Sequence, residues 1–269
     1  MPSHPFISVV IASYNAAYTI KQCIESFCRQ TYANKELIII DGASVDSTCK
    51  IIKTFSNKIT YWESSPDKGV YDAWNKALDH VKGDWICFIG ADDFFWDDKV
   101  LENMAQILCR QDEEETRIVY GKVAILDSLG DIIRVDGVPW KEAKENIFKY
   151  MSIPHPGLMH HKSIFNLYGK FDDRFAISGD YELLLRYLKN GDAVFYPEIM
   201  VGMRTGGIST QKELFLKILI EEARARHKNN INFINIRWIK SVIYTILTPI
   251  LGYKFLRIIR HVLRFRRAN

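Results

Sequence analysis

Acidic residues are absent from the last part of this chain of 269 residues. No Asp or Glu follows Glu222, although eleven Lys and Arg residues do. Residues 1–222 carry 25 basic and 32 acidic side chains, so the net charge of +4 comes from the tail alone. This asymmetry argues against a uniformly basic protein. It favours an acidic body followed by a separate element that seeks a negatively charged surface.

The sequence also lacks paired cysteines and a cleavable apolar leader. Its five cysteines are odd in number and do not have the spacing of zinc sites, so we expect buried thiols in a reducing cytoplasm. The first five residues run directly into an apolar segment, which gives no sign of secretion. Because 48% of the residues are hydrophobic, the chain can bury a sizeable core as an ordinary globular protein.

No glycine stands in the turn after the first apolar run, where the sequence reads Ala12-Ser-Tyr-Asn-Ala-Ala17. A dinucleotide-binding Rossmann domain needs a glycine-rich turn at that point. The absence argues against a nicotinamide-dependent dehydrogenase, although the pattern of the first hundred residues is otherwise that of an α/β protein.

Short apolar runs alternate with amphipathic stretches over that region. Residues 6–12, 37–40 and 85–89 are continuously apolar, which predicts strands buried on both faces. A helical stripe runs from Val70 to Val81, with Gly83 as its end, and another helix begins near Asp46. The alternation predicts a mostly parallel sheet with crossover helices, which binds ligands beyond the carboxyl ends of its strands.

The pattern is less regular from residue 118 onwards. Residues 118–126 and 131–135 predict a hairpin around a turn at 128–130, and residues 153–157 predict a loop with two prolines. A helix is predicted over residues 181–189, with Asp180 at its N-terminal edge.

Polar residues follow the predicted strands at the edge where ligands would bind. They are Ser13, Tyr14 and Asn15 after the first strand, Asp41 after the second, and Asp92 with Asp93 after the third. Adjacent carboxylates suit a hard divalent cation that bridges protein oxygens to the phosphates of a nucleotide. The alternative is a turn that caps the next helix.

Five motifs in chain order resemble the inverting glycosyltransferases of family 2, which have the A-type nucleotide-diphospho-sugar transferase fold. The resemblance covers about residues 6–208. The motifs are Ser8-Val-Val-Ile-Ala-Ser-Tyr-Asn15, Asp41-Gly-Ala-Ser-Val-Asp-Ser-Thr48, Asp67-Lys-Gly-Val-Tyr-Asp-Ala-Trp-Asn75, Gly90-Ala-Asp-Asp93 and Ser178-Gly-Asp-Tyr-Glu-Leu-Leu-Leu-Arg186.

The resemblance implies that Asp41 contacts the nucleotide base, while Ser13, Tyr14 and Asn15 shape the pocket around base and ribose. A carboxylate can accept the imide N–H of uracil, so UDP is the expected nucleotide. The alternative is that Asp41 only terminates its strand. We expect Ser44 and Asp46 to brace this loop and cap the following helix.

The resemblance also places Lys68, Gly69 and Asp72 along the donor pocket, where a cation and a helix N-terminus suit an anion. The alternative is an exposed Lys and Asp on a solvated helix face. At the metal motif Gly90 replaces an acidic residue of many relatives. Asp92 then corresponds to the metal-binding position, with Asp93 as a second candidate, for Mn²⁺ or Mg²⁺.

Asp180 corresponds to the general base of the family, which takes a proton from the acceptor hydroxyl as it attacks. The alternative is a helix N-cap.

His155, between two prolines, is a candidate for orienting acceptor or phosphate, or else a structural histidine. Arg204, in a glycine-containing segment, is a candidate for closing over the diphosphate.

The tail begins with a polar helix over residues 211–226. An apolar stretch, residues 241–253, is shorter than the roughly twenty residues of a membrane span and contains Pro249. Residues 255–263 then place apolar side chains on one helix face, whereas Arg257, Arg260, Arg264 and Arg267 gather on another. This favours a helix lying on an anionic membrane over a packing or oligomer helix, and both over a nucleic-acid arm.

The sequence thus predicts a catalytic domain over residues 1–210 and a helical extension over 211–269. It predicts a metal-dependent hexosyl- or N-acetylhexosaminyltransferase in the cytoplasm, peripheral on the inner face of the cell membrane. The acceptor would be a lipid-linked glycan of a bacterial surface polysaccharide such as O-antigen or capsule. The alternatives are a non-catalytic sugar-nucleotide or glycan-binding protein, and a membrane scaffold whose body is inert.

Overall fold

The structure is a computed structural model that describes residues 4–110, 116–207 and 212–232, with residues 234, 238–243 and 245 beyond them. The predicted basic and apolar helix of the tail lies outside the described residues. Among those that are described, no helix is long and apolar enough to cross a bilayer.

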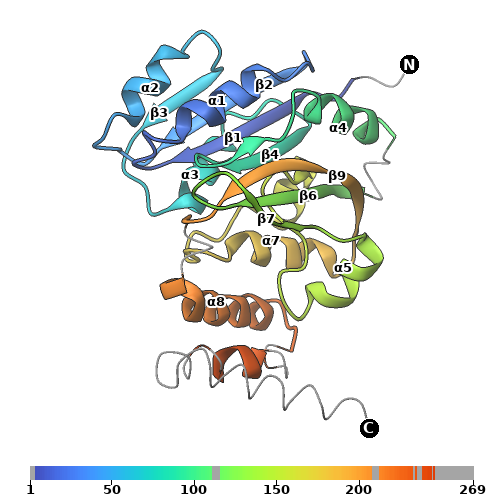
Figure 1. The fold of residues 1–269 in the computed structure, drawn as a ribbon. Helices are drawn as coiled ribbons and strands as arrows, with labels where there is room; N and C mark the ends of the chain where they lie inside the picture. The colour runs from blue at the N-terminus through green and yellow to red at the C-terminus, as the bar shows by residue number, and fades with distance from the viewer. Residues whose placement is uncertain are drawn as a thin grey trace.

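A mixed sheet forms the centre of the molecule (Figure 1). Its strands are β1 (Ile7–Ser13), β2 (Lys35–Asp41), β3 (Tyr61–Ser64), β4 (Trp85–Gly90), β5 (Phe94–Phe95), β6 (Thr116–Leu126), β7 (Ile132–Asp136), β8 (Met159–His161) and β9 (Asp192–Arg204). Their order is β3-β2-β1-β4-β8-β6-β9-β5, with β7 paired to β6. The first four are parallel to one another, β8 runs antiparallel to both of its neighbours, and β6 pairs in parallel with β9.

Helices cover both faces of the sheet. They are α1 (Ile20–Cys28), α2 (Thr48–Thr54), α3 (Val70–Ala77), α4 (Val100–Leu108), α5 (Trp140–Ile147), α6 (Ser163–Tyr168), α7 (Gly179–Leu188) and α8 (Phe215–Lys228), which follows a short 3-10 helix, η2 (Lys212–Leu214). The α/β architecture expected from the sequence, with helices flanking a central sheet, is confirmed.

Alternate residues of the strands feed two separate cores. Ile7, Val9 and Ile11 of β1 pack with α1, α2 and α4 on one face. Val10 packs with α3, α5, α6 and α7 on the other, as the period of two in a strand requires. Both faces are therefore apolar, which explains the continuous apolar runs of β1, β2 and β4.

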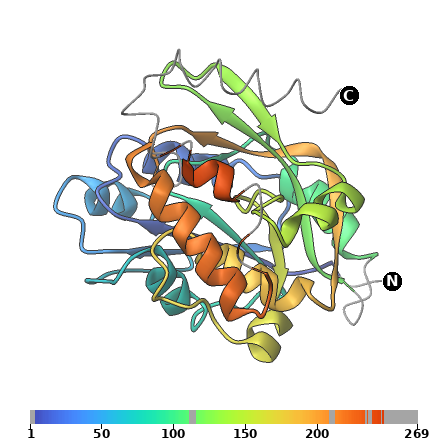
Figure 2. The same ribbon diagram turned by 90° about the horizontal axis from the view of Figure 1, so that it is seen from below.

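The helix α8 lies outside the second helical layer, against α7 (Figures 1 and 2). Its buried Arg226 donates to the carbonyl of Lys149 at 3.0 Å, and Lys228 pairs with the buried Glu182 of α7 at 2.8 Å. The first part of the expected extension is thus packed onto the body of the protein. The division of the chain at residue 210 stays a prediction.

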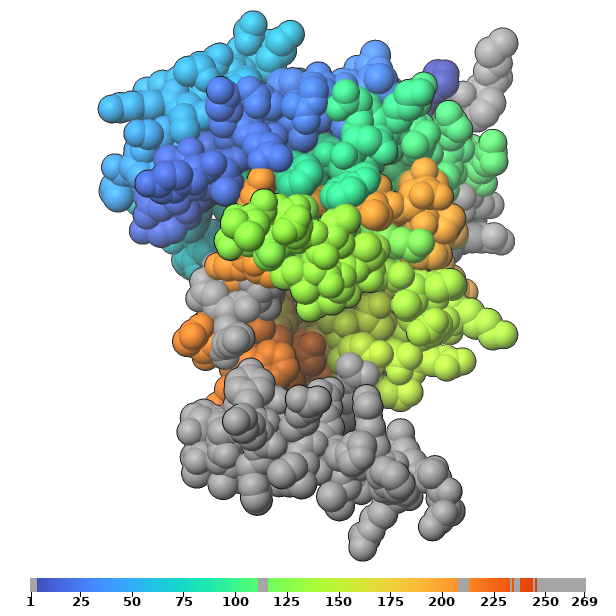
Figure 3. All heavy atoms as spheres, viewed as in Figure 1, coloured from blue at the N-terminus to red at the C-terminus, as the bar shows by residue number. Residues whose placement is uncertain are grey.

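Several elements differ from expectation. The helix α3 ends at Ala77, six residues before Gly83, because the residues that follow form turns. The predicted hairpin is present as β6 and β7, and it lies on the surface shown in Figure 3 with Leu129, Ile132 and Ile133 exposed. The strand β9 was not predicted, since Pro197 interrupts it and irregular register with β6 accommodates that proline.

Candidate active site

The carboxyl ends of β1, β2, β3 and β4 meet at one edge of the sheet. Ser13 stands opposite Asp41, Asp41 stands opposite Ser64, and Ala12 stands opposite Gly90. Because these strands are parallel neighbours, the segments that follow them lie side by side. The structure thereby brings together the polar residues predicted after the first, second and later strand.

Asp41 lies at the bottom of this edge and is fully buried. Its Oδ1 accepts hydrogen bonds from the hydroxyls of Ser13 and Ser44, at 2.9 and 2.6 Å. Its Oδ2 accepts from the amide of Ser44, the hydroxyl of Ser64 and the thiol of Cys49, at 2.8, 2.7 and 3.2 Å. Burial by itself would raise the pKa of Asp41, but these donors outweigh it and lower the pKa below its ordinary value.

The loops after β1 and β2 brace each other above Asp41. The amide of Asn15 donates to the Ser44 hydroxyl at 2.8 Å, and the Asn15 side chain accepts from the amide of Val45 at 3.0 Å. Asp46 accepts from the amides of Ala17 and Thr48. The bracing expected of Ser44 and Asp46 is present. Tyr14 is 67% exposed, so its ring is available to a ligand lying over this edge.

The start of α3 lies beside the same loops. Lys68 is exposed and pairs with Asp173 at 3.1 Å, while its amide donates to Asp72. Gly69 has a φ of 124°, a conformation that favours glycine, and no atom lies within 4 Å of where its Cβ would be. A Cβ on Gly42 would lie 2.7 Å from Oδ2 of Asp67, which places the two loops in contact. Contact of Lys68, Gly69 and Asp72 with a nucleotide stays a prediction.

The loop after β4 carries the candidate metal ligands. Asp92 is partly exposed, and Asp93 is buried with its Oδ2 accepting the Gly90 amide at 3.0 Å. Burial raises the pKa of Asp93 well above its ordinary value, and the charge of Asp92 adds to the effect. A Cβ at Gly90 would lie 2.6 Å from Asp92 Oδ1, and one at Gly207 would lie 2.9 Å from Asp92 Oδ2. Glycines thus leave room for the Asp92 carboxylate.

Arg204 of β9 holds this loop from the side. It donates to the backbone carbonyl of Asp92 at 2.8 Å and to the Gln22 side chain, and its guanidinium lies over the ring of Phe94 at 5.1 Å. Its cation therefore stands beside the two carboxylates. The predicted contact of Arg204 with a diphosphate stays a prediction.

In the part of the chain that the structure describes, no three His, Cys, Asp or Glu residues are grouped as a metal site. The two carboxylates of the β4 loop still fit a divalent cation of the kind that relies on substrate phosphates for further ligands. Such ions often use only one or two protein carboxylates. The Oδ1 atom of Asp93 is buried without a hydrogen-bond partner among the described residues, so its lone pairs are available to a cation at this point.

Asp180 is the second residue of α7, and its side chain is only partly exposed. Its Oδ1 accepts the amide of Tyr181 at 2.7 Å and lies 3.1 Å from the hydroxyl of Tyr71. Burial raises the pKa of Asp180 to about 6. A carboxylate with that pKa is ionised at neutral pH yet basic enough to accept a proton in a reaction.

The motif that contains α3 explains why Asp180 lies beside the edge formed by the carboxyl ends of β1 to β4. The side chain of Asn75 exchanges two hydrogen bonds with the backbone of Phe171, at 2.8 and 3.0 Å. Tyr71 donates to the carbonyl of Ile177 at 2.5 Å. The segment before α7 is thus attached to α3, and the residues just before α3 contact the loop after β2.

His155 is buried, and its ring stacks on Trp74 at a centroid distance of 5.1 Å. Burial lowers the pKa of His155 to about 3, so the ring is neutral. The structure places it within an aromatic cluster with Phe88 and Phe171. This is the packing expected of a structural histidine; a contact with acceptor or phosphate stays a prediction.

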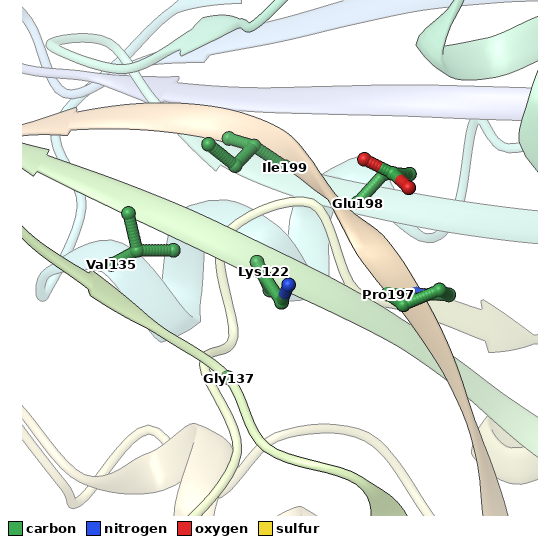
Figure 4. A pocket seen from close by; sticks show the side chains of 6 residues that line it. All are labelled: Lys122, Val135, Gly137, Pro197, Glu198 and Ile199. Atoms are coloured by element: carbon green, nitrogen blue, oxygen red, sulfur yellow. The ribbon is translucent and has the colours of Figure 1, made fainter.

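Two surface hollows lie apart from these residues. One, of about 410 Å³, lies between β6, β7 and β9 (Figure 4) and is lined by Lys122, Val135, Gly137, Pro197, Glu198 and Ile199. The other is lined by Asp97, Asp98, Lys99 and Asn103. Neither includes a predicted site residue, and the convergence of polar groups at the strand ends is the stronger indication of a site.

Sequence reasoning missed several residues that shape the site, among them Tyr71 and Glu221. Tyr71 stands in a quoted motif, but nothing in its spacing shows that its hydroxyl reaches Asp180. Glu221 of α8 accepts hydrogen bonds from the amides of Ala176, Ile177 and Ser178, at 3.1, 2.8 and 2.9 Å. A contact across more than forty residues carries no local signal.

Comparison with known proteins agrees with this geometry. A family model described as Glycosyl transferase family 2 matches residues 8–149. A PGL/p-HBAD biosynthesis glycosyltransferase of Mycobacterium bovis (strain BCG / Pasteur 1173P2) is 28% identical over 191 residues, which make up 69% of this chain and 71% of that protein. An uncharacterized glycosyltransferase of Rickettsia typhi is 26% identical over 212 residues, covering 77% of this chain and 66% of the relative.

Solved structures share the fold at lower identity. The mannosyltransferase PcManGT from Pyrobaculum calidifontis, in complex with GDP-Man and Mn²⁺, superimposes with a TM-score of 0.64 at 13% identity, covering 91% of this chain and 70% of that one. S. aureus TarS 1-349 in complex with UDP-GlcNAc gives 0.62 at 15% identity, covering 91% and 73%. This chain spans only 44% of a longer TarS chain, with a TM-score of 0.58.

Proposed function

Because the chain belongs to glycosyl transferase family 2, we propose that it moves a sugar from a nucleoside-diphosphate donor to a hydroxyl of a glycan, with inversion at the anomeric carbon. The observation that carries this proposal is the placement of Asp180. Its partly buried carboxylate, with a pKa of about 6, is joined through Tyr71 to the helix that starts at the donor edge.

Inversion requires a single displacement. The acceptor oxygen forms a bond to the anomeric carbon while the bond from that carbon to the diphosphate oxygen breaks. The electron pair leaves with the nucleoside diphosphate, and the proton of the acceptor hydroxyl passes to Asp180. The hydrogen bonds from Tyr71 and Tyr181 both go to Oδ1 of Asp180, which leaves Oδ2 to take this proton.

Asp92 and Asp93 would hold a divalent cation, Mn²⁺ or Mg²⁺. Such an ion, when bound, supplies Lewis acidity toward the oxygens of the diphosphate. The room that Gly90 and Gly207 leave around Asp92 supports this assignment. Arg204 would add a fixed positive charge beside the same loop.

We expect a UDP-sugar as the donor, transferred as a hexosyl or N-acetylhexosaminyl group. Asp41, Ser13 and Asn15 would line the base and ribose, and the exposed ring of Tyr14 would cover the base. Asp41 already accepts five hydrogen bonds. A direct contact with uracil therefore requires that one of these hydrogen bonds breaks. Otherwise the base binds to the loop that Asp41 stabilises. TarS, a relative in fold, has been crystallised with UDP-GlcNAc.

The acceptor we propose is a lipid-linked glycan of a bacterial surface polysaccharide, met at the inner face of the cytoplasmic membrane. The basic tail supports this location, and so does α8, which leaves Phe215, Leu216 and Ile220 exposed.

The test of this membrane location is sedimentation of the full chain with anionic vesicles. A variant with Arg257, Arg260, Arg264 and Arg267 changed to Gln should stay in the supernatant; equal sedimentation of both would exclude this role of the tail.

Turnover of Asp180→Asn tests the catalytic proposal against the alternative of a non-catalytic binding protein. Release of nucleoside diphosphate would be measured from a panel of UDP-, GDP- and dTDP-sugars, with Mn²⁺ and a mixture of candidate acceptors. Asp79→Asn, which changes an exposed carboxylate in the turn after α3, is the matched control. Activity of the wild type and the control, with loss in Asp180→Asn, supports the proposal. Equal turnover by all three removes Asp180 as the base, and no turnover by any favours the binding protein.

A further inference from the structure

The segment that carries Asp180 is held from two sides by helices on either side of it in the chain. On one side α3 supplies Asn75 and Tyr71, as described above. On the other side α8 supplies Glu221, whose side chain is buried with only 7% exposure. Its two oxygens accept three consecutive backbone amides, those of residues 176, 177 and 178.

Three amide donors on one carboxylate make a strong and directional attachment. Hydrogen bonds to an ionised acceptor are stronger than neutral ones, and a buried amide that loses its acceptor is costly. The last of these amides belongs to Ser178, the residue at the N-terminal cap of α7. A carboxylate at that place is also favoured by the dipole of the helix.

Further contacts fix α8 itself relative to α7. Lys228 pairs with Glu182 at 2.8 Å and with Asp172 at 2.9 Å, and Asn229 donates to Glu182 at 3.3 Å. Glu221 is therefore mounted on a helix that cannot move independently of α7. The two carboxylates Glu182 and Glu221 serve different parts: the first anchors α8, and the second acts on the segment before Asp180.

We propose that Glu221 is a positioning residue for Asp180, which it acts on through the backbone amides of residues 176–178. Tyr71 of α3 holds the same segment from the other side. Its hydroxyl donates to the carbonyl of Ile177 and lies beside the Asp180 carboxylate. The ring of Tyr71 also packs on Gly179, where a Cβ would lie 2.8 Å from the ring. The geometry of the base thus depends on residues beyond the stretch that the family model matches.

The inference rests on the proposed function of Asp180, yet its test does not require turnover. In the full chain, Glu221→Gln keeps the size of the side chain but removes its charge and leaves one acceptor oxygen. Glu213→Gln, an exposed carboxylate just before α8, is the matched control. Hydrogen exchange of the Ile177 and Ser178 amides should accelerate about tenfold or more in Glu221→Gln and remain unchanged in the control.

The titration of Asp180 gives a second readout, which reports whether Glu221 and Tyr71 act on the electrostatics of its carboxyl. The ¹³C resonance of its carboxyl, assigned by its absence in Asp180→Asn, should titrate at a lower pH in Glu221→Gln, because a nearby negative charge is removed. In Tyr71→Phe it should titrate at a higher pH, because a hydrogen bond to the carboxylate is lost. Opposite shifts of the Asp180 pKa in the two variants support the inference that α8 and α3 both act on this residue.

Two results would overturn the inference: unchanged amide exchange in Glu221→Gln, or a titration of Asp180 that neither variant moves. If Glu221→Gln does not fold, Glu221→Asp, which keeps the charge but shortens the side chain, takes its place and should also accelerate exchange of the Ile177 and Ser178 amides. With a donor identified, kcat of Glu221→Gln should fall about tenfold while KM for the donor is unchanged. Absence of turnover in the wild type would contradict the proposed function and leave these spectroscopic results intact.

Discussion

Asp41 is buried and Asp180 is partly buried, but their environments shift their pKa values in opposite directions. Asp41 accepts five hydrogen bonds, and its pKa lies below the ordinary value. Asp180 has one amide donor and a shared tyrosine hydroxyl, and burial raises its pKa to about 6. Burial alone therefore does not determine the charge of a carboxylate. The number of donors decides which one is a permanent anion and which one can accept a proton.

The difference assigns the two carboxylates to different tasks. A carboxylate saturated with donors organises the loops that it touches and is a poor base. A carboxylate with an unused oxygen and a raised pKa is suited to proton transfer near neutral pH. The following predictions test that contrast.

The largest effect is expected from Asp180→Asn. Removing a general base typically costs about 10²- to 10⁴-fold in rate, so kcat should fall by that amount while the melting temperature changes little. The wild-type kcat/KM should rise with pH, reach half of its plateau near pH 6 and then level off, since the base must be ionised. If the chemical step limits kcat/KM, a profile that is flat between pH 5 and 8 would contradict the assignment of Asp180 as the general base.

Asp41→Asn should reduce stability rather than rate alone. The amide group of Asn offers a donor where Ser13, Ser44 and Ser64 also donate, so several buried donors lose their acceptor. We expect a loss of about 3 kcal/mol in the free energy of unfolding, measured in urea. Because the pKa of Asp41 is lowered on folding, its contribution is present near neutral pH and disappears as pH falls below the ordinary carboxyl range. An Asn variant as stable as the wild type at pH 7 would contradict this account.

His155 shows what burial does without donors. Its pKa is about 3 in the folded protein and about 6.5 when exposed, so the unfolded chain takes up a proton as the pH falls from 7 to 5. This should cost about 2 kcal/mol of stability. His155→Phe should remove that part of the pH dependence, whereas His4→Gln, at an exposed position, should retain it. If the unfolding free energies of the two variants change equally with pH between 7 and 5, His155 does not contribute to the pH dependence in this way.

The smallest effect is expected from Ser64→Ala, which removes one of the five donors to Asp41. The pKa of Asp41 should move up toward its ordinary value, and the unfolding free energy should fall by about 1 kcal/mol. Ser65→Ala, whose hydroxyl lies 3.4 Å from Glu63 rather than Asp41, is the control. If the control loses as much stability, the effect of Ser64 does not pass through Asp41.

The sequence was sufficient for three strands in the first half of the fold. Strands β1, β2 and β4 are covered by helices on both faces, so each is a continuous apolar run that is easy to recognise. The strand β9 escaped recognition because Pro197 and polar residues break its pattern. Its pairing with β6, through irregular register, and its pairing with β5 keep it extended.

The site residues that could be predicted are those marked by their position next to a predicted strand or helix. Asp41 and Asp92 stand directly after strands, and Asp180 stands at the start of a helix, so position and motif together identify them. The donors Cys49 and Ser64 and the carboxylate of Glu221 reach the site from other elements. Such contacts depend on how the helices pack, which no periodicity in the sequence encodes.

Calorimetric titration of UDP, in the presence of Mn²⁺, into the wild type, Asp41→Asn and Asp180→Asn tests the central claim most directly, because it requires neither the sugar nor the acceptor. It would be run at a temperature where circular dichroism shows all three proteins folded. The account predicts equal binding by the wild type and Asp180→Asn, and at least tenfold weaker binding by Asp41→Asn. Loss of binding in Asp180→Asn with retention in Asp41→Asn, or no binding by the wild type, would contradict it.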